Sequence, residues 1–267
     1  EHGFTNRVKR AGAPRHGKCL RAMPLESGSP GRHTVLDHNA RAWNRLAEGR
    51  VALAKPAVDE AFGDPRTWLG SGGSGGAAGQ SWLPERLDGL AVLCLAAGGG
   101  KHGPLYAAAG AKVTVLDISP AMLELDRAVA RERRIDLEIL QGSMDDLSMI
   151  GPGRFDLVVH PVSTCYLPDV GRVFREVARV TRPGGLYVSQ HKSPASLQAS
   201  LEPAASGRYE LVHPQVGAAP LPPAPPSRLR ETGTQEFIHP LSALLGGIDR
   251  KSTRLNSSHE WISRMPS

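Results

Sequence analysis

A run of three glycines follows a short apolar segment, and this combination constrains the fold more than any other feature. Residues 92–95 are Val-Leu-Cys-Leu, and after two alanines residues 98–100 are all glycine. Glycine lets a backbone turn sharply and approach a ligand because no Cβ stands in the way. A second apolar run, residues 113–116, ends on Asp117, 19 residues after the first of these glycines. This order predicts a nucleotide-type βαβ unit, in which the acid meets ribose hydroxyls.

The glycines alone fit two classes of adenosine-bearing cofactor. Residues 98–103 satisfy G-x-G-x-x-G, the fingerprint of NAD-type domains. Residues 92–100 also resemble the first motif of class I S-adenosylmethionine (SAM)-dependent methyltransferases, written V-L-D-L-G-C-G-x-G. Cys94 stands where that family has an acid, and Ala96 stands where it has its first glycine. Alanine is the smallest substitute for glycine, so a ligand can still approach closely.

Four further segments resemble the methyltransferase family, in the family's order and at its spacing. Residues 117–123 resemble D-x-S-x-x-M-L, and residues 137–147 resemble the third strand with its acidic loop. Residues 155–160 resemble the fourth strand, F-D-L-V-x. Residues 174–185 resemble the helix and turn E-x-x-R-V-L-K-P-G-G, which precede the fifth strand. The resemblance covers residues 88 to 192 and favours SAM over NAD.

The resemblance implies an α/β fold. We expect a Rossmann-like, doubly wound, mainly parallel sheet of order 3-2-1-4-5, with helices on both faces. Near-continuous apolar runs are typical of strands that are buried on both faces of such a sheet. In this family an antiparallel hairpin flanks strand five. We expect that hairpin to be missing here, which would leave strand five with an unpaired edge.

The chain divides into five expected parts. Residues 1–33 are a disordered or non-native extension, residues 34–69 a helical lid, residues 70–87 a Gly/Ser-rich linker, and residues 88–248 the SAM-binding methyltransferase domain. Residues 249–267 back-translate into DNA that resembles a short-read sequencing adapter. We therefore expect them to be an artefactual tail, to be set aside like any fusion scar.

The family's activity is the transfer of a methyl group from SAM to an acceptor. We expect such an enzyme, acting on an unidentified small molecule. One alternative is an NAD-dependent oxidoreductase, but the Tyr-x-x-x-Lys proton relay that it would need does not follow the fourth strand. The other is a non-catalytic SAM-binding protein, which Cys94, Ala96 and Ser143 favour because they depart from the family pattern.

The resemblance also implies the cofactor contacts. Asp117 is expected to hold the ribose hydroxyls, the glycine loop to border the methionine part, and the loop at residues 144–147 to frame the adenine. The expected cofactor-binding residues are Ala96, Ala97, Gly98, Gly99, Gly100, Asp117, Ile118, Met144, Asp145, Asp146 and His160.

His160 is also the expected catalytic residue, because it ends the fourth strand beside the methyl group. A general base there would assist a hydroxyl or protonated amine acceptor. His102, His191 and Tyr166 are weaker candidates. Trp43, in a helical segment, either covers the SAM pocket or packs on the domain surface. No metal is expected, since no cluster of His, Asp and Glu has ligand spacing.

The charge pattern argues against a nucleic-acid partner. The formal net charge is +6. Residues 1–33 hold seven basic and two acidic residues and residues 249–267 hold four and two, so residues 34–248 carry a charge of −1. No run reaches the length of a membrane span, and no signal peptide opens the chain. Three scattered cysteines suit a reducing cytoplasm.

Overall fold

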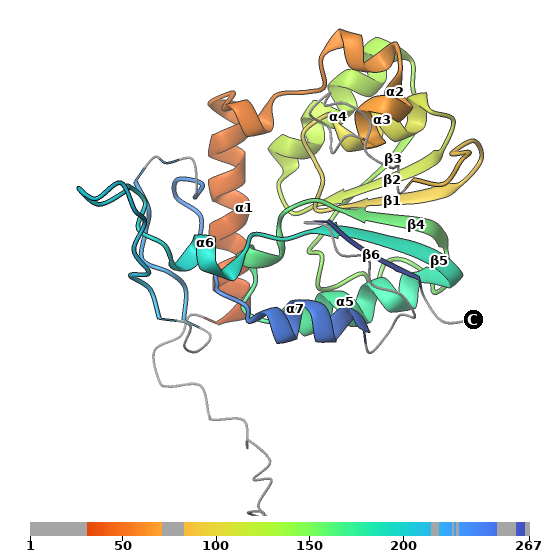
Figure 1. Ribbon diagram of the computed structural model, residues 1–267. Coiled ribbons are helices and arrows are strands. Elements are labelled where there is room, and N and C mark those ends of the chain that lie inside the picture. Colours follow the sequence, from red (N-terminus) through yellow and green to blue (C-terminus); the bar gives the residue numbers. More distant parts are fainter. Residues whose placement is uncertain are drawn as a thin grey trace, which may run out of the picture.

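The computed structural model describes residues 31–70, 83–214, 219–225, 227, 230–249 and 260–264. Five parallel strands form one sheet in the order β3-β2-β1-β4-β5, which confirms the expected order. A sixth strand lies beyond β5 (Figure 1). The strands are β1 (Ala91–Leu95), β2 (Lys112–Asp117), β3 (Leu137–Gln141), β4 (Phe155–His160), β5 (Thr181–Gln190) and β6 (Glu260–Arg264).

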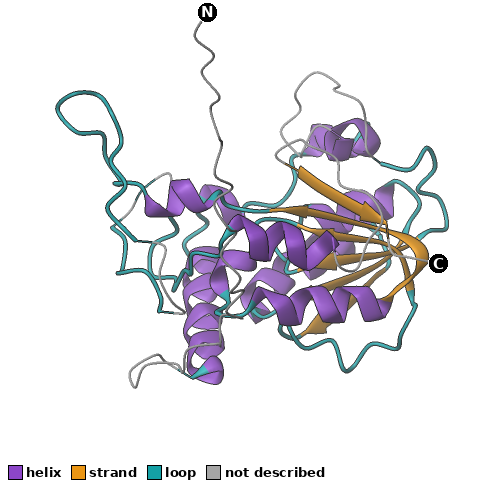
Figure 2. Cartoon of the chain, turned by 60° about the horizontal axis from the view of Figure 1, so that its bottom comes forward, coloured by secondary structure: helices purple, strands orange, loops and turns teal. Residues whose placement is uncertain are grey.

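Helices cover both faces of this sheet (Figure 2). Strand β1 shows why, since all of Val92, Leu93, Cys94 and Leu95 are fully buried and neighbouring side chains point to opposite faces. Leu93 and Leu95 pack in a core cluster with α5 (Val170–Val180) and α7 (Leu241–Asp249). Val92 and Cys94 pack in a second cluster with α2 (Pro65–Gly70), α3 (His102–Ala108) and α4 (Pro120–Arg133).

The long helix α1 (Arg32–Glu48) stands across one end of the sheet (Figure 1). It begins two residues before the expected boundary of the lid. Short helical turns η1 (Ala52–Ala54) and η2 (Asp59–Phe62) follow it, and η3 (Thr164–Tyr166) and α6 (Pro194–Gln198) follow β4 and β5 respectively. The greater part of the predicted N-terminal extension, linker and tail lies outside the described residues.

The edge of β5 is not open, so that expectation is wrong. Strand β6 pairs with it antiparallel, from Leu186 opposite Arg264 to Gln190 opposite Glu260. Tryptophan and isoleucine occupy two of its five positions, and both favour strands. An unpaired edge offers a row of hydrogen-bonding groups that such a segment satisfies. Five residues of the expected artefactual tail therefore complete the sheet.

Local signals place the turn into α4 at the cavity end of the sheet. Ser119 caps the helix by accepting a hydrogen bond from the Met122 N–H, 3.1 Å away, and Pro120 occupies the first helical position. This cap fixes the chain directly after Asp117. Among the described residues, no helix combines the length and apolar character needed to cross a bilayer.

Candidate cofactor and acceptor site

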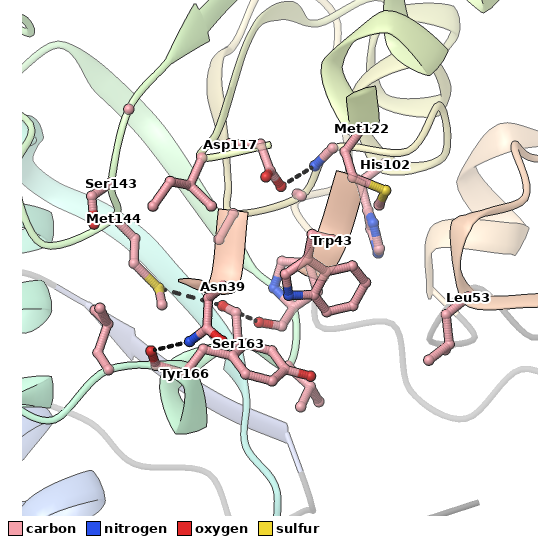
Figure 3. A pocket seen from close by; sticks show the side chains of 18 of the residues that line it. Asn39, Trp43, Leu53, His102, Asp117, Met122, Ser143, Met144, Ser163 and Tyr166 are labelled. Carbon is pink, nitrogen blue, oxygen red and sulfur yellow. Dashed lines mark hydrogen bonds between the residues drawn. The ribbon is translucent and has the colours of Figure 1, made fainter. Parts of the chain in front are cut away.

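A cavity of about 290 Å³ lies where β1, β2, β3 and β4 end, and α1 closes it from the other side. Open α/β sheets bind ligands at this edge. Figure 3 shows Ser143 and Met144 at one end of the cavity, His102 and Trp43 at the other, and Asp117 between them. The lining residues are Leu36, Asn39, Trp43, Leu53, Ala96, Ala97, Gly98, Lys101, His102, Asp117, Ile118, Met122, Gly142, Ser143, Met144, Pro161, Val162, Ser163, Tyr166, Leu167 and Gln190.

Asp117 and Gly98 meet at the middle of this cavity. The carboxylate of Asp117 accepts the Gly98 N–H at 2.9 Å through Oδ2 and the Ser119 N–H at 2.9 Å through Oδ1. A Cβ on Gly98 would lie 2.9 Å from Met122 Cβ and 3.0 Å from Asp117 Oδ2, so only glycine fits. Burial raises the pKa of Asp117, and the N–H groups that it accepts oppose that shift.

The other two glycines shape the turn and do not line the cavity. Gly99 and Gly100 have φ of +119° and +72°, a region that other residues rarely adopt. A Cβ on Gly99 would lie 2.8 Å from Met122 Cε, and one on Gly100 would lie 3.0 Å from Val129 Cγ2. Of the expected glycine-loop residues, Ala96, Ala97 and Gly98 therefore line the cavity.

The loop after β3 contributes its backbone and Met144 to the cavity, but its acids point elsewhere. Asp145 is 3% exposed and receives two hydrogen bonds from Arg32, at 2.6 and 2.7 Å. Burial alone would raise the pKa of Asp145, but hydrogen bonds from Arg32 and Ser143 hold it below its usual range. Asp146 accepts the Ser148 N–H at 3.2 Å. Asp145 and Asp146 are both absent from the cavity lining.

His160 lies behind the cavity wall. It is 1% exposed, and its Nδ1 shares a hydrogen bond with the Tyr187 hydroxyl at 2.7 Å. Its Nε2 shares another with Ser163 Oγ at 2.6 Å, and it is Ser163 that lines the cavity. Burial, with a smaller contribution from His191, lowers the pKa of His160 to about 3. Both ring nitrogens are engaged, so this geometry suits a residue that positions Ser163 and does not favour a general base.

Of the weaker candidates, His102 and Tyr166 line the cavity and His191 does not. Burial and the neighbouring Lys101 lower the pKa of His102 to about 4, so its ring is neutral at pH 7. His191 lies between Thr164 Oγ1 and Ser189 Oγ, at 2.9 and 3.0 Å. The hydroxyl of Tyr166 donates to Glu231 at 2.6 Å, and burial raises the pKa of that phenol well above its usual value.

Helix α1 does cover the cavity, which is one of the two roles considered for Trp43. The indole meets the Tyr166 ring edge-on, with centroids 5.5 Å apart and planes at 81°. Asn39, one turn earlier, donates from Nδ2 to the Tyr166 carbonyl at 2.9 Å and accepts the Gln235 N–H at 2.7 Å. Asn44 accepts the Ser119 hydroxyl at 2.7 Å. The cover is thus tied to three separate parts of the chain.

A cluster of ion pairs in the segment after β5 was not identified from the sequence. Glu231 of this cluster accepts the hydrogen bond of the Tyr166 hydroxyl. Lys192 forms ion pairs with Glu231 and Glu236, and Arg230 pairs with the same Glu236. These four side chains are at most 15% exposed. No local motif marks them, because their pairing depends on a loop that returns to the sheet about 40 residues later in the chain.

Comparisons with known proteins show which family this chain is similar to. A model of the methyltransferase domain family matches residues 93–189. The uncharacterized methyltransferase YbaJ of Bacillus subtilis is 32% identical over 222 residues, which cover 80% of this chain and 86% of that protein. This chain belongs to the class I SAM-dependent methyltransferases. Membership decides between the two cofactor classes, in favour of SAM and against NAD.

Two other similarities are more limited. A ubiquinone biosynthesis O-methyltransferase of Xanthomonas campestris is 31% identical over 112 residues, and the match spans about half of that protein, 47%. The solved structure of the PH0226 protein from Pyrococcus horikoshii is 18% identical, with a TM-score of 0.55 over 82% of this chain and 98% of that one. That likeness concerns the fold alone.

The residues of this methyltransferase fit its cofactor. SAM offers a flat adenine, a ribose diol and a sulfonium with an amino-acid tail. Asp117 is a buried carboxylate that faces the middle of the cavity, and Ile118, Met144 and Gly142 line the adjoining end. Gly98 lines the cavity without a side chain, because a Cβ there would clash with Met122 and Asp117. A hydrogen-bond acceptor flanked by an apolar slot and a glycine wall is suited to a nucleoside.

Proposed function

We propose that this methyltransferase transfers the SAM methyl group to a small, uncharged, largely apolar acceptor that binds beside Trp43 and Tyr166. The observation that carries the proposal is one continuous cavity, which runs from Asp117 to these two aromatic rings. In it Asp117 would hold the ribose, Ile118 and Met144 the adenine, and Gly98 the start of the methionine part.

The acceptor end of the cavity supports an uncharged nucleophile. Apart from Asp117, no Asp or Glu is among the described residues that line the cavity. An ammonium group would therefore lose its hydration without gaining a carboxylate partner. A hydroxyl or thiol suits this end better, and a related enzyme named as an O-methyltransferase is consistent with an oxygen acceptor.

The cofactor supplies an already activated methyl group, so the main task of the protein is orientation. Proximity and alignment account for about 7–11 kcal/mol of barrier lowering in well-oriented systems. Trp43 and Tyr166 would exclude water and align the acceptor, while His160 would hold Ser163 at the wall. We assign His160 this positioning role. The proton that the hydroxyl or thiol loses on methylation would pass to the neutral His102 ring, which lines the cavity, or to water.

We further propose residues 34–69 as the lid and residues 88–248 as the catalytic domain. A reducing cytoplasm suits the free, buried thiols of Cys94 and Cys165. Among the described residues, no three His, Cys, Asp or Glu side chains are grouped so that they could hold a metal ion.

Three probes that share a benzene ring test the proposal: phenylmethanethiol, catechol and benzylamine, each with methyl-labelled SAM. We expect label in the thiol or catechol product and none in the amine, which is charged at neutral pH. Preferential methylation of benzylamine would contradict an uncharged acceptor. Binding of SAM with no transfer to any probe would favour the non-catalytic alternative.

A further inference from the structure

Asp126 is a fully buried carboxylate directly behind the glycine loop. It lies in the middle of α4 and is 0% exposed. Its side chain does not line the cavity. Oδ1 lies only 3.4 Å from the point where a Cβ on Gly103 would stand, and the same point is 2.4 Å from Val115 Cγ2. The carboxylate thus sits in a confined pocket between α4, α3 and β2.

Asp126 accepts a hydrogen bond from one of two consecutive backbone N–H groups in the glycine loop. Its Oδ2 accepts the Gly99 N–H at 2.8 Å, while the preceding Gly98 N–H goes to Asp117 Oδ2 at 2.9 Å. The Met122 carbonyl is a second, longer acceptor for Gly99, at 3.1 Å. Because Gly98 lines the cavity, the Asp126 bond sets the orientation of the peptide that faces the cofactor.

The other oxygen of this carboxylate is unpaired. Asp126 Oδ1 is buried and has no hydrogen-bond partner among the residues that the structure describes. Leaving a buried polar atom unsatisfied costs about 1–3 kcal/mol, and more for a charged group. An apolar side chain would avoid this cost, so stability alone does not account for an acid here.

We propose that Asp126 is a positioning residue for the cofactor: it holds the Gly98–Gly99 peptide in the orientation that binds SAM and couples binding to the release of a proton. This inference rests on the proposed function of the cavity. A carboxylate accepts an N–H more strongly than a carboxylic acid does. Its negative charge also favours a sulfonium cation nearby.

The surroundings of Asp126 put its titration near neutrality. Burial raises the pKa of Asp126 to about 7, although the N–H groups of Gly99 and Gly100 lower it. The Asp117 carboxylate on β2 raises it further, and Arg127 on the same helix lowers it. The facing group on β1 is the Cys94 thiol, whose own pKa burial raises well above its usual value. Both forms of Asp126 are thus populated at pH 7.

Calorimetric titration of the full chain with SAM at pH 6, 7 and 8 tests this coupling. If binding lowers the pKa of Asp126 from about 7 by about 1 unit, the wild type binds about fivefold more tightly at pH 8 than at pH 6. Titration at pH 7 in two buffers of different ionisation enthalpy then reports net proton release. The α-amino group of SAM also titrates in this range, but it is common to all variants.

Three variants separate the effect of the Asp126 titration on SAM affinity from the effect of the hydrogen bond to the Gly99 N–H. Asp126→Asn keeps an acceptor for the Gly99 N–H and removes the titration, so its SAM affinity should lose the fivefold pH dependence. Asp126→Leu removes the acceptor and should bind more weakly at every pH. Glu132→Gln changes an exposed carboxylate on the same helix and should follow the wild-type curve.

Two results would overturn the inference: a pH dependence of Asp126→Asn equal to that of the wild type, or wild-type affinity in Asp126→Leu. If Asp126→Leu does not fold, the wild type and Asp126→Asn still decide the question. A folded wild type that binds no SAM at any pH would instead contradict the proposed function itself.

Discussion

The floor and the cover of the cavity differ in how far apart along the chain their contacting residues lie. The floor consists of residues 96–98, 117–118 and 142–144, which follow three neighbouring parallel strands. The cover consists of α1 and residues 161–167, tied by hydrogen bonds between residues 75 to 196 positions apart. A local turn at a strand end leaves a motif in the sequence, whereas a long-range contact does not. The floor could therefore be predicted from local motifs. A lid at residues 34–69 was expected from the family resemblance, but the contacts that hold it could not be predicted.

Gly98→Ala should distort the floor of the cavity and have the largest effect on SAM affinity. The added Cβ would lie 2.9 Å from Met122 Cβ and 3.0 Å from Asp117 Oδ2. We expect SAM to bind about 30-fold more weakly, equivalent to about 2 kcal/mol. Calorimetry measures this against Gly151→Ala, where a Cβ meets nothing within 4 Å. Wild-type affinity in Gly98→Ala would place the cofactor elsewhere.

Trp43→Ala should open the cover while leaving the floor intact. Removing the ring that meets Tyr166 edge-on exposes the acceptor end to water. We expect KM for the acceptor to rise about tenfold, as one buried aromatic contact is lost. The control is Trp68→Ala, whose ring packs in the core cluster with Leu69 and does not line the cavity. Equal kinetic effects of the two variants would contradict a specific role for Trp43.

His160→Gln should lower stability more than activity. The His160 ring links the Tyr187 hydroxyl to Ser163 and does not itself line the cavity. A lost general base reduces turnover by about 10²–10⁴-fold. We expect turnover per folded molecule to fall only about threefold. This is a change of less than about 1.4 kcal/mol in the activation free energy, the amount that corresponds to tenfold. A loss of 100-fold with an altered pH profile of turnover would restore His160 as the base.

The same substitution should change how stability depends on pH. The pKa of His160 is about 3 in the fold against 6.5 for the free side chain, so the unfolded chain binds the extra proton between these values. Stability contributed by the neutral ring is present above pH 6.5 and is lost as pH falls toward 3. Urea denaturation between pH 7 and 5 should show a shallower decline for His160→Gln than for the wild type.

Arg32→Gln should have the smallest effect, because it loosens only the tie between cover and floor. Arg32 is the partner of Asp145, and both groups are partly withdrawn from water. We expect SAM to dissociate about threefold faster, which corresponds to less than 1 kcal/mol. Stopped-flow dissociation of SAM from Arg32→Gln, Asp145→Asn and the double variant forms a cycle. Additive effects would show that the two residues act independently.

The elements that sequence predicted well are those with a local physical cause. The strand order followed from motifs at strand ends, and Asp117 and Gly98 lie together at the cavity because a βαβ unit brings them there.

The features that the structure places differently from the expectation depend mostly on partners far along the chain. Asp145 was expected at the adenine, but Arg32 lies 113 residues earlier and engages both of its oxygens. His160 was expected at the methyl group, yet Tyr187 and Ser163 occupy its ring. Strand β6 fills an edge that was expected to be open. Apart from Ser163, which is three residues after His160, these partners lie 27 or more positions away, outside any local motif.

Titration of SAM, and separately of NADH, into the wild type and Asp117→Ala tests the central claim most directly. The account predicts that SAM binds the wild type, that Asp117→Ala loses this binding while keeping a cooperative melt, and that NADH binds neither. Binding of NADH without SAM, or SAM binding unchanged in Asp117→Ala, would contradict the assignment of this cavity to the cofactor.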